Sequence, residues 1–284
     1  MNSKANNESH SGAKSEMGSE RNSKSRSEMG SEMKSESRSE MKSKRNNMSR
    51  SEMKGEMQIE MESANSKPIK YISAKARPEL SDYLESKGYC VVRTEPCKTV
   101  PAEISDHPDL LMCRLGISGD APIVIGKPAE LGASYPADIP YNAVCTGNFF
   151  IHNLRFTAGG LLDIVRAKAK QGEMTLVDVK QGYAKCSTVI VDERSIITYD
   201  RGIAEPCLKA GMDVLLISPG HIRLDGYNTG FVGGCSGRIK DTIIFNGDLS
   251  RHPDFEAITL FIQSKGLKCK WFPGWALEDI GSII

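Results

Sequence analysis

Two cysteines lie in sequence surroundings that could favour a reactive thiol. Cys186 directly follows Lys185 at the start of an expected strand, and a neighbouring ammonium favours the thiolate of a cysteine that faces a site. Cys235 lies in a glycine-rich loop, where the backbone can approach a ligand closely. Each also has a plainer interpretation, because a free cysteine is most often a small buried apolar side chain. Both are candidate nucleophiles.

Two histidines are candidates for moving protons. His221 follows Ser218-Pro219-Gly220 at the end of an expected buried strand, and Asp225, four residues later, could orient its ring. His107 precedes Pro108 and Asp109, so an imidazole and a carboxylate stand close together. The alternative for His221 is an exposed loop histidine, and for His107 to Asp109 a turn fixed by proline.

Five polar residues are candidates for binding a substrate. Three of them, Asp138, Asn142 and Asn153, lie at expected strand ends, where such residues more often hydrogen-bond to nearby backbone groups. The candidates are Asp109, Asp138, Asn142, Asn153 and Asp225. The histidines and cysteines lack the spacing of a zinc site, and neither a dinucleotide fingerprint nor a G-x-S-x-G elbow occurs. We therefore expect no metal and no cofactor.

The elements that must position these residues follow a repeating order. From Asn142 onward, the pattern predicts strand, tight turn, strand, helix and strand three times, with a repeat of roughly 45 residues, as in arrays of one supersecondary unit. The three expected helices are Leu161–Lys170, Gly202–Ala210 and Pro253–Ser264.

Two less regular units precede these three. A helix over Glu79–Ser86, bounded by Pro78 and Gly88, leads into a strand over Tyr89–Arg93 whose Cys90 to Val92 segment we expect to be buried. A second hairpin is expected from Leu110–Leu115 and Pro122–Ile125, without a helix. The apolar residues Ile280–Ile284 are expected to add a strand that closes a ring with the N-terminal piece.

About five units that each combine sheet and helix predict an α/β fold of the β/α-propeller type. An open, doubly wound sheet is the competing arrangement, but its units enter with a single strand rather than a hairpin. The propeller domain is expected to span residues 67–284. Residues 1–66 are a low-complexity tail of Ser, Glu, Met and Lys. We expect this tail to be disordered because it cannot bury enough apolar surface to offset the entropy lost on ordering.

The net charge of +1 gives no global field that would recruit nucleic acid. The sequence contains no apolar stretch of transmembrane length and no signal peptide, so we expect no membrane association. The eight cysteines lie outside the tail and lack C-x-x-C pairs, which predicts reduced thiols in a cytoplasmic protein.

Three segments resemble a known family: Q-G-Y-A-K-C-S at 181–187, G-F-V-G-G-C-S-G at 230–237 and N-F-F-I-H-N at 148–153. With them, the chain from Tyr71 to Ile284 resembles an uncharacterised domain family assigned to the guanidino-group-modifying (pentein) fold. The resemblance implies five ββαβ units about a pseudo-fivefold axis, with any site in the central channel.

Relatives of that fold include arginine and agmatine deiminases, amidinotransferases and dimethylarginine hydrolases, which work through a cysteine, and a ribosome anti-association factor, which does no chemistry. The cysteine of those enzymes lies near the end of the last repeat, whereas no thiol follows Cys269 in this chain. The resemblance thus implies either a Cys-dependent hydrolase or transferase acting on a guanidine-like or amidine-like small molecule, or a non-catalytic protein that binds a ligand or a macromolecule.

Overall fold

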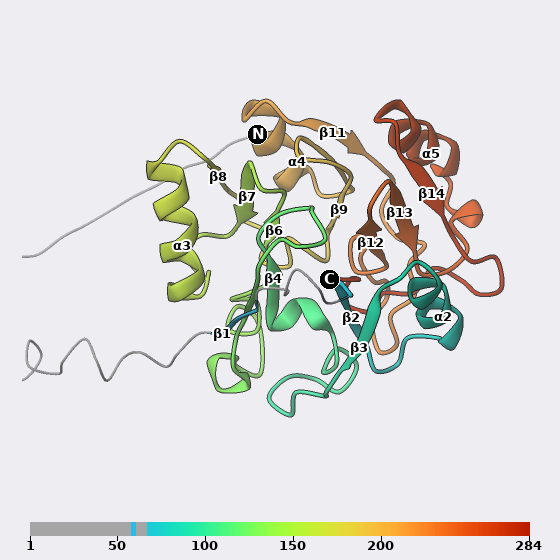
Figure 1. Ribbon diagram of the computed structural model, residues 1–284, viewed down its shortest axis with the longest axis horizontal. Coiled ribbons are helices and arrows are strands. Elements are labelled where there is room, and N and C mark those ends of the chain that lie inside the picture. The colour runs from blue at the N-terminus through green and yellow to red at the C-terminus, as the bar shows by residue number, and fades with distance from the viewer. Residues whose placement is uncertain (1–57, 61–66) are drawn as a thin grey trace, which may run out of the picture. The chain divides into compact units, whose positions relative to one another are not determined.

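The predicted order of strands and helices recurs in the structure, a computed structural model that describes residues 67–284 and the backbone of residues 58–60 (Figure 1). The described part is a mixed α/β structure of small sheets with two or three strands each. The predicted disordered tail lies outside the described residues, except for Gln58–Glu60. These three residues form strand β1, which the sequence analysis did not predict.

Three units share one topology: an antiparallel hairpin, a helix, and a third strand that runs parallel to the second strand of the hairpin. The first comprises β6 (Val144–Cys145), β7 (Phe149–His152), α3 (Gly159–Lys170) and β8 (Thr175–Asp178). The second comprises β9 (Thr188–Ile190), β10 (Ser195–Thr198), α4 (Arg201–Lys209) and β11 (Asp213–Leu216). The third comprises β12 (Ser236–Ile239), β13 (Thr242–Phe245), α5 (Phe255–Ser264) and β14 (Lys268–Lys270).

Two further units contain part of this pattern. In one, β2 (Ile69–Ser73) and β3 (Cys90–Thr94) are parallel and are joined by α2 (Pro78–Ser86). In the other, β5 (Ile123–Ile125) pairs with β4 (Met112–Arg114) and with β1, and no α-helix follows. Short 3₁₀ turns lie at Pro108–Leu110 (η1), Pro128–Glu130 (η2) and Leu249–Arg251 (η3).

The prediction that Cys90 to Val92 form a buried strand core is wrong. Cys90 is exposed and Val92 is 36% exposed, because β3 pairs only with β2 among the described strands and lies at the edge of its sheet. The fully buried residues of this unit lie instead in β2 and α2. They are Ile72 of β2 and Leu80 and Leu84 of α2.

Apolar side chains between the sheets and their helices form the core, as the helix–sheet layers require. In the third unit, Ile258 and Ile262 of α5 pack with Ile243 and Phe245 of β13. Strand β4 lies close to β6, and β9 close to β12, so neighbouring units are in contact. In Figure 1 helices α2 and α3 lie at the periphery of the described part, outside the strands of their own units.

The last residues of the chain join the third unit to strand β2. Ile283 forms a parallel bridge with Gly237 of β12, and the backbone of Ile284 exchanges two hydrogen bonds with Tyr71, at 3.0 and 3.1 Å. The expected contact between Ile280–Ile284 and the N-terminal piece is therefore present, although it is a bridge rather than a full strand.

No helix among the described residues combines the length and the apolar character that a membrane span requires. All eight cysteines are free thiols.

Candidate functional site

The segment 181–187, which carries Cys186, is fixed to the first unit by a buried histidine. His152 at the end of β7 has its Nε2 3.1 Å from the carbonyl oxygen of Gly182 and its Nδ1 2.7 Å from Thr157 Oγ1. The carbonyl can only accept, so Nε2 carries the proton and donates it to Gly182. Burial lowers the pKa of His152 to about 4, so the ring is neutral at physiological pH.

Asn142 holds the next part of the same segment. Its Oδ1 accepts from the backbone N–H of Lys185 (2.9 Å) and of Cys186 (3.1 Å), while its Nδ2 donates to Cys186 Sγ at 3.0 Å. One buried amide therefore fixes both the backbone and the thiol, and the predicted binding residue Asn142 becomes a contact of the candidate nucleophile.

The thiol of Cys186 contacts a carboxylate from a distant part of the sequence. Cys186 Sγ donates to Asp109 Oδ2 at 3.0 Å, and the same oxygen accepts from Ser282 Oγ at 2.7 Å. Lys185 Nζ in turn donates to Ser282 Oγ at 2.9 Å. The result is a buried chain of hydrogen bonds, from the ammonium through the hydroxyl and the carboxylate to the thiol.

Burial and neighbouring carboxylates keep this thiol protonated. The pKa of Cys186 is raised well above its usual value, first by burial and then by the charges of Asp109 and Asp279. Burial lowers the pKa of Lys185, an effect that Asp109 opposes. In the resting site, Cys186 is thus a neutral thiol hydrogen-bonded to a proton acceptor, and an added positive charge nearby would favour its ionisation.

A second carboxylate, Asp279, is fixed close by. Its oxygens accept from the backbone N–H of Phe231 (2.9 Å) and of Gly281 (3.0 Å), and Oδ1 lies 3.9 Å from Nδ1 of His107. Burial raises the pKa of Asp279, and the proximity of His107 acts in the opposite direction. Gly281 has φ 67°, a conformation that favours glycine, and a Cβ there would lie 2.2 Å from that of His107.

Three of these residues line a cavity of about 160 Å³. They are Cys186, His107 and Asp279, and the remaining lining is apolar or aromatic apart from Thr229. The ring centroids of Tyr183 and Phe231, which both line the cavity, lie 5.8 Å apart. The ring of Tyr199, which is not part of the lining, stacks on Phe231 with a centroid distance of 6.2 Å. The other lining residues are Ile104, Leu110, Leu224, Tyr227 and Thr229.

The site thus brings together four of the residues predicted from the sequence: Cys186, His107, Asp109 and Asn142. Asp138 lies one contact further out, where its Oδ2 accepts from the Tyr183 hydroxyl at 2.6 Å. Burial, and after it this hydrogen bond, raises the pKa of Tyr183. Asp138 therefore orients a wall of the cavity and does not itself line it.

The other predicted residues lie elsewhere. Cys235 is fully buried in the apolar core of the second and third units, and its thiol donates to the carbonyl of Val232 at 3.1 Å. His221 is exposed and contacts the ring of His252, while Asp225 pairs with Arg223 at 2.9 Å instead of orienting His221. Asn153 donates to the backbone carbonyl of Lys180 at 3.1 Å, which is the plainer role of a polar residue at a strand end.

Sequence reasoning missed Asp279 and Ser282. Ser282 lies in Ile280–Ile284, which was predicted only as a closing strand, and Asp279 directly precedes that segment. The sequence contained a signal, because Gly281 and Ser282 interrupt the apolar residues of the predicted strand. Ser282 has φ 74°, an uncommon conformation for a residue with a side chain. Among the described residues, no group of three or more His, Cys, Asp or Glu side chains could hold a metal ion.

Comparison with known proteins gives one match. The model of a family of unknown function (DUF6873) matches residues 120–284, which include Asn142, Lys185, Cys186, Asp279 and Ser282 but not His107 or Asp109. No curated protein and no solved structure matches the chain.

Proposed function

The chain belongs to this family of unknown function, and from the geometry of its site we propose that it is a Cys-dependent hydrolase or transferase. The nucleophile is Cys186, and the substrate is a small molecule with a guanidinium or amidinium carbon. The observation that carries the proposal is the position of the Cys186 thiol, 3.0 Å from Asp109 and lining a cavity with His107 and Asp279.

The charge of the cavity favours a cationic ligand. Asp279 is the one carboxylate among the described residues that line it, and no lysine or arginine is among them. Aromatic rings attract a planar cation through their faces, and Tyr183, Phe231 and Tyr227 all line the cavity. A bound guanidinium or amidinium would also bring a positive charge toward Cys186, whose thiolate the resting site disfavours.

The reaction follows from these positions. Cys186 transfers its proton to Asp109 Oδ2 as the Sγ–carbon bond forms, which gives a tetrahedral centre. The carbon–nitrogen bond then breaks, and His107, on the same cavity, donates a proton to the leaving amine. Water in a hydrolase, or an acceptor amine in a transferase, attacks the carbon next and gives a proton to His107. The Sγ–carbon bond then breaks, and Asp109 returns its proton to the sulfur, which restores the Cys186 thiol.

Asn142 supports the same step by donating to the sulfur. Its N–H contact of 3.0 Å remains available when the proton has left, so it stabilises a thiolate more than a thiol. Burial excludes bulk water from the thiol, which strengthens each of these contacts.

We propose further that the five units form a β/α-propeller of the pentein type. Three properties support this arrangement: the hairpin–helix–strand topology of three units, the partial pattern of two others, and the contacts of Ile283 and Ile284 with β12 and β2. The residues that meet in the site are Asp109, Asn142, Cys186 and Ser282. Each lies in or next to a different unit, as expected for a site near a central axis.

A non-catalytic binding protein is the second candidate, and the protonated state of Cys186 favours it. A panel of alkylguanidines and amidines distinguishes the two, with release of ammonia or amine as the readout. Catalysis predicts release by the wild-type protein and none by Cys186→Ser, while Cys235→Ser keeps the activity. Saturable binding of the same compounds without release by either protein would favour the binding function.

A further inference from the structure

A larger cavity, of about 320 Å³, lies next to the cavity of Cys186. The two cavities share three lining residues, which are His107, Leu224 and Asp279. His107 and Asp279 therefore also contact a space that the proposed reaction does not use. Together the two cavities have room for a molecule that is longer than its reacting group alone.

The ring of His107 is available to a ligand in this space. His107 is 7% exposed, and the one ion pair of its ring among the described residues is the 3.9 Å contact of Nδ1 with Asp279, which is too long for a hydrogen bond. No hydrogen bond to this ring occurs in the described part of the chain. Buried imidazole nitrogens normally have partners, so a group bound beside His107 would supply what the protein does not.

The larger cavity has an acidic lining, and we call it the acidic cavity. Its charged side chains, apart from His107, are Glu103, Asp225, Glu278, Asp279 and Lys75. Four carboxylates thus line the same space as one ammonium.

The one lysine of this lining does not neutralise it. The ammonium of Lys75 lies 3.2 Å from Asp106, which is not part of the lining, and donates to the backbone carbonyls of Ala102 (2.8 Å) and Glu103 (3.1 Å). These three contacts account for the three protons of an ammonium.

Two of the carboxylates have no such partner. Asp225 pairs with Arg223, but among the described residues no basic side chain lies within 4 Å of the carboxylate of Glu103 or Glu278. Glu103 is exposed and Glu278 is half-buried, so both can accept from a group that enters from solvent. The acidic cavity therefore attracts a positive charge.

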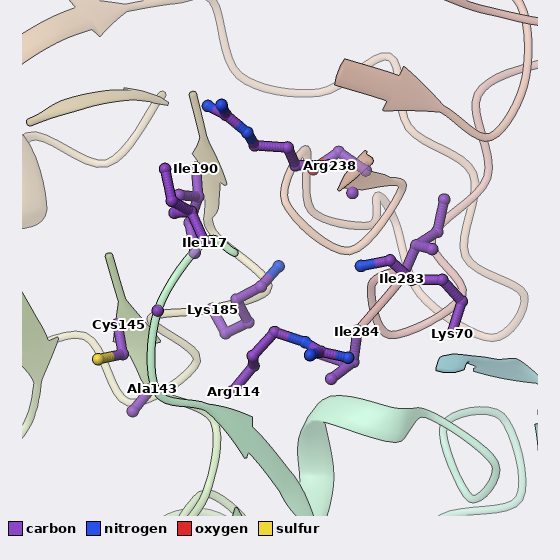
Figure 2. A pocket seen from close by; sticks show the side chains of 13 residues that line it. Lys70, Arg114, Ile117, Ala143, Cys145, Lys185, Ile190, Arg238, Ile283 and Ile284 are labelled. Carbon is purple, nitrogen blue, oxygen red and sulfur yellow. The ribbon is translucent and has the colours of Figure 1, made fainter. Parts of the chain in front are cut away.

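The cavity on the other side of the Cys186 segment has the opposite charge. Lys185 lines it together with Lys70, Arg114 and Arg238, and no acidic side chain is part of its described lining. Figure 2 shows the side chains of Lys70, Arg114 and Lys185 extending into this region from separate segments. A positively charged end of a ligand would be repelled there, so the acidic cavity is the favourable place for it.

We propose that the substrate carries a second positive charge, a primary ammonium group that occupies the acidic cavity while the guanidinium or amidinium carbon lies against Cys186. Glu103 and Glu278 bind the ammonium, and His107 lines the passage between the two ends. This inference rests on the proposed function, because it takes the cavity of Cys186 as the place of the reacting carbon.

The test compares two series of linear alkylguanidines, from propyl to hexyl, one ending in a primary amine and the other in a hydroxyl group. Binding is measured by calorimetry at constant ionic strength on the full chain carrying Cys186→Ser, so that turnover cannot consume the compounds. Glu103→Gln and Glu278→Gln are made in this background. Glu256→Gln, at an exposed glutamate in the first turn of α5, is the matched control.

The best aminoalkylguanidine is expected to bind about three- to tenfold more tightly than the hydroxyalkyl compound of the same length. Glu103→Gln and Glu278→Gln should each reduce this preference about two- to fivefold, whereas Glu256→Gln retains it. Because Glu103 is exposed, its variant keeps the test decisive if Glu278→Gln fails to fold. Equal affinities of the two series, or a preference that neither cavity variant reduces, would overturn the inference.

These outcomes are distinct from a failure of the proposed reaction. Release of ammonia or amine by the wild type without a preference for the aminoalkyl series leaves the reaction in place and removes the second binding site. A preference for the aminoalkyl series without release supports the ammonium site and contradicts the reaction. Absence of binding by both series contradicts both.

Discussion

Acid should lower the free energy of unfolding, because the ring of His152, which links β7 to the Cys186 segment, is buried in its neutral form. His152 is fully buried and is hydrogen-bonded to Gly182 and Thr157. Its pKa falls from 6.5 in the unfolded chain to about 4 in the folded protein. Between these two values the unfolded chain binds the proton and the folded protein does not, so stability is lost as the pH falls.

The size of the effect follows from the same two pKa values. Each pKa unit corresponds to about 1.36 kcal/mol, so His152 should account for about 3 kcal/mol of the free energy of unfolding. This contribution is fully present above pH 6.5 and is lost progressively as the pH falls to about 4. It is a large share of the roughly 5–15 kcal/mol that stabilises an ordinary domain.

Urea unfolding at a series of pH values from 7 to 4, on the wild type and on His152→Gln, isolates this contribution. Glutamine retains an N–H donor for the Gly182 carbonyl but does not titrate in this range. The variant is expected to be less stable at pH 7 but to lose about 3 kcal/mol less than the wild type on acidification. Parallel curves for the two proteins would show that His152 does not titrate as the structure implies.

Three further predictions concern the site and the core. Gly234→Ala would place a Cβ 1.9 Å from Asp279 Oδ1 and should cost about 1–3 kcal/mol by overpacking, measured by urea unfolding, whereas Gly159→Ala has open space and should not destabilise. Asp109→Asn removes a negative charge beside Cys186 and should lower the pKa of that thiol, seen in the thiolate ultraviolet absorbance after subtracting a Cys186→Ser background; an unchanged or raised pKa would contradict the described contact. Ile262→Ala in α5 should cost about 2–5 kcal/mol, and a loss below 1 kcal/mol would show that α5 does not pack as described.

The repeating units could be predicted from the sequence because their elements are local. Alternating apolar residues, a tight turn and an amphipathic helix recur in order, and the observed helices begin and end within three residues of the predicted bounds. Strand β2 was missed because Ile69–Ser73 contains a lysine that is buried in the fold, which breaks the expected alternation.

The site was only partly predictable because its contacts join distant parts of the chain. Cys186 and Asp109 are 77 positions apart, and Ser282 and Asp109 are 173 apart, so no local spacing relates them. The adjacency of Lys185 and Cys186 was a correct signal for the thiol, but its physical meaning differs from the expectation. Lys185 contacts the thiol through Ser282 and Asp109, and the thiol stays protonated instead of ionising.

One of the two candidate nucleophiles named from the sequence does not lie in the site. Cys235, in a glycine-rich loop, packs among apolar side chains. Gly233, two positions earlier, allows close approach of the Lys185–Thr188 backbone. The glycines therefore serve the packing of two chain segments there, and no cavity among those described is lined by Cys235.

The most direct test of the proposed chemistry is covalent trapping of Cys186 by 2-chloroacetamidine, followed by peptide mass spectrometry. Neutral 2-chloroacetamide serves as the matched probe, because it lacks the charge that Asp279 would attract. The account predicts one adduct, on Cys186, formed faster with the amidine than with the amide, absent in Cys186→Ser and retained in Cys235→Ser. Equal rates with the two probes, or an adduct that persists in Cys186→Ser, would contradict it.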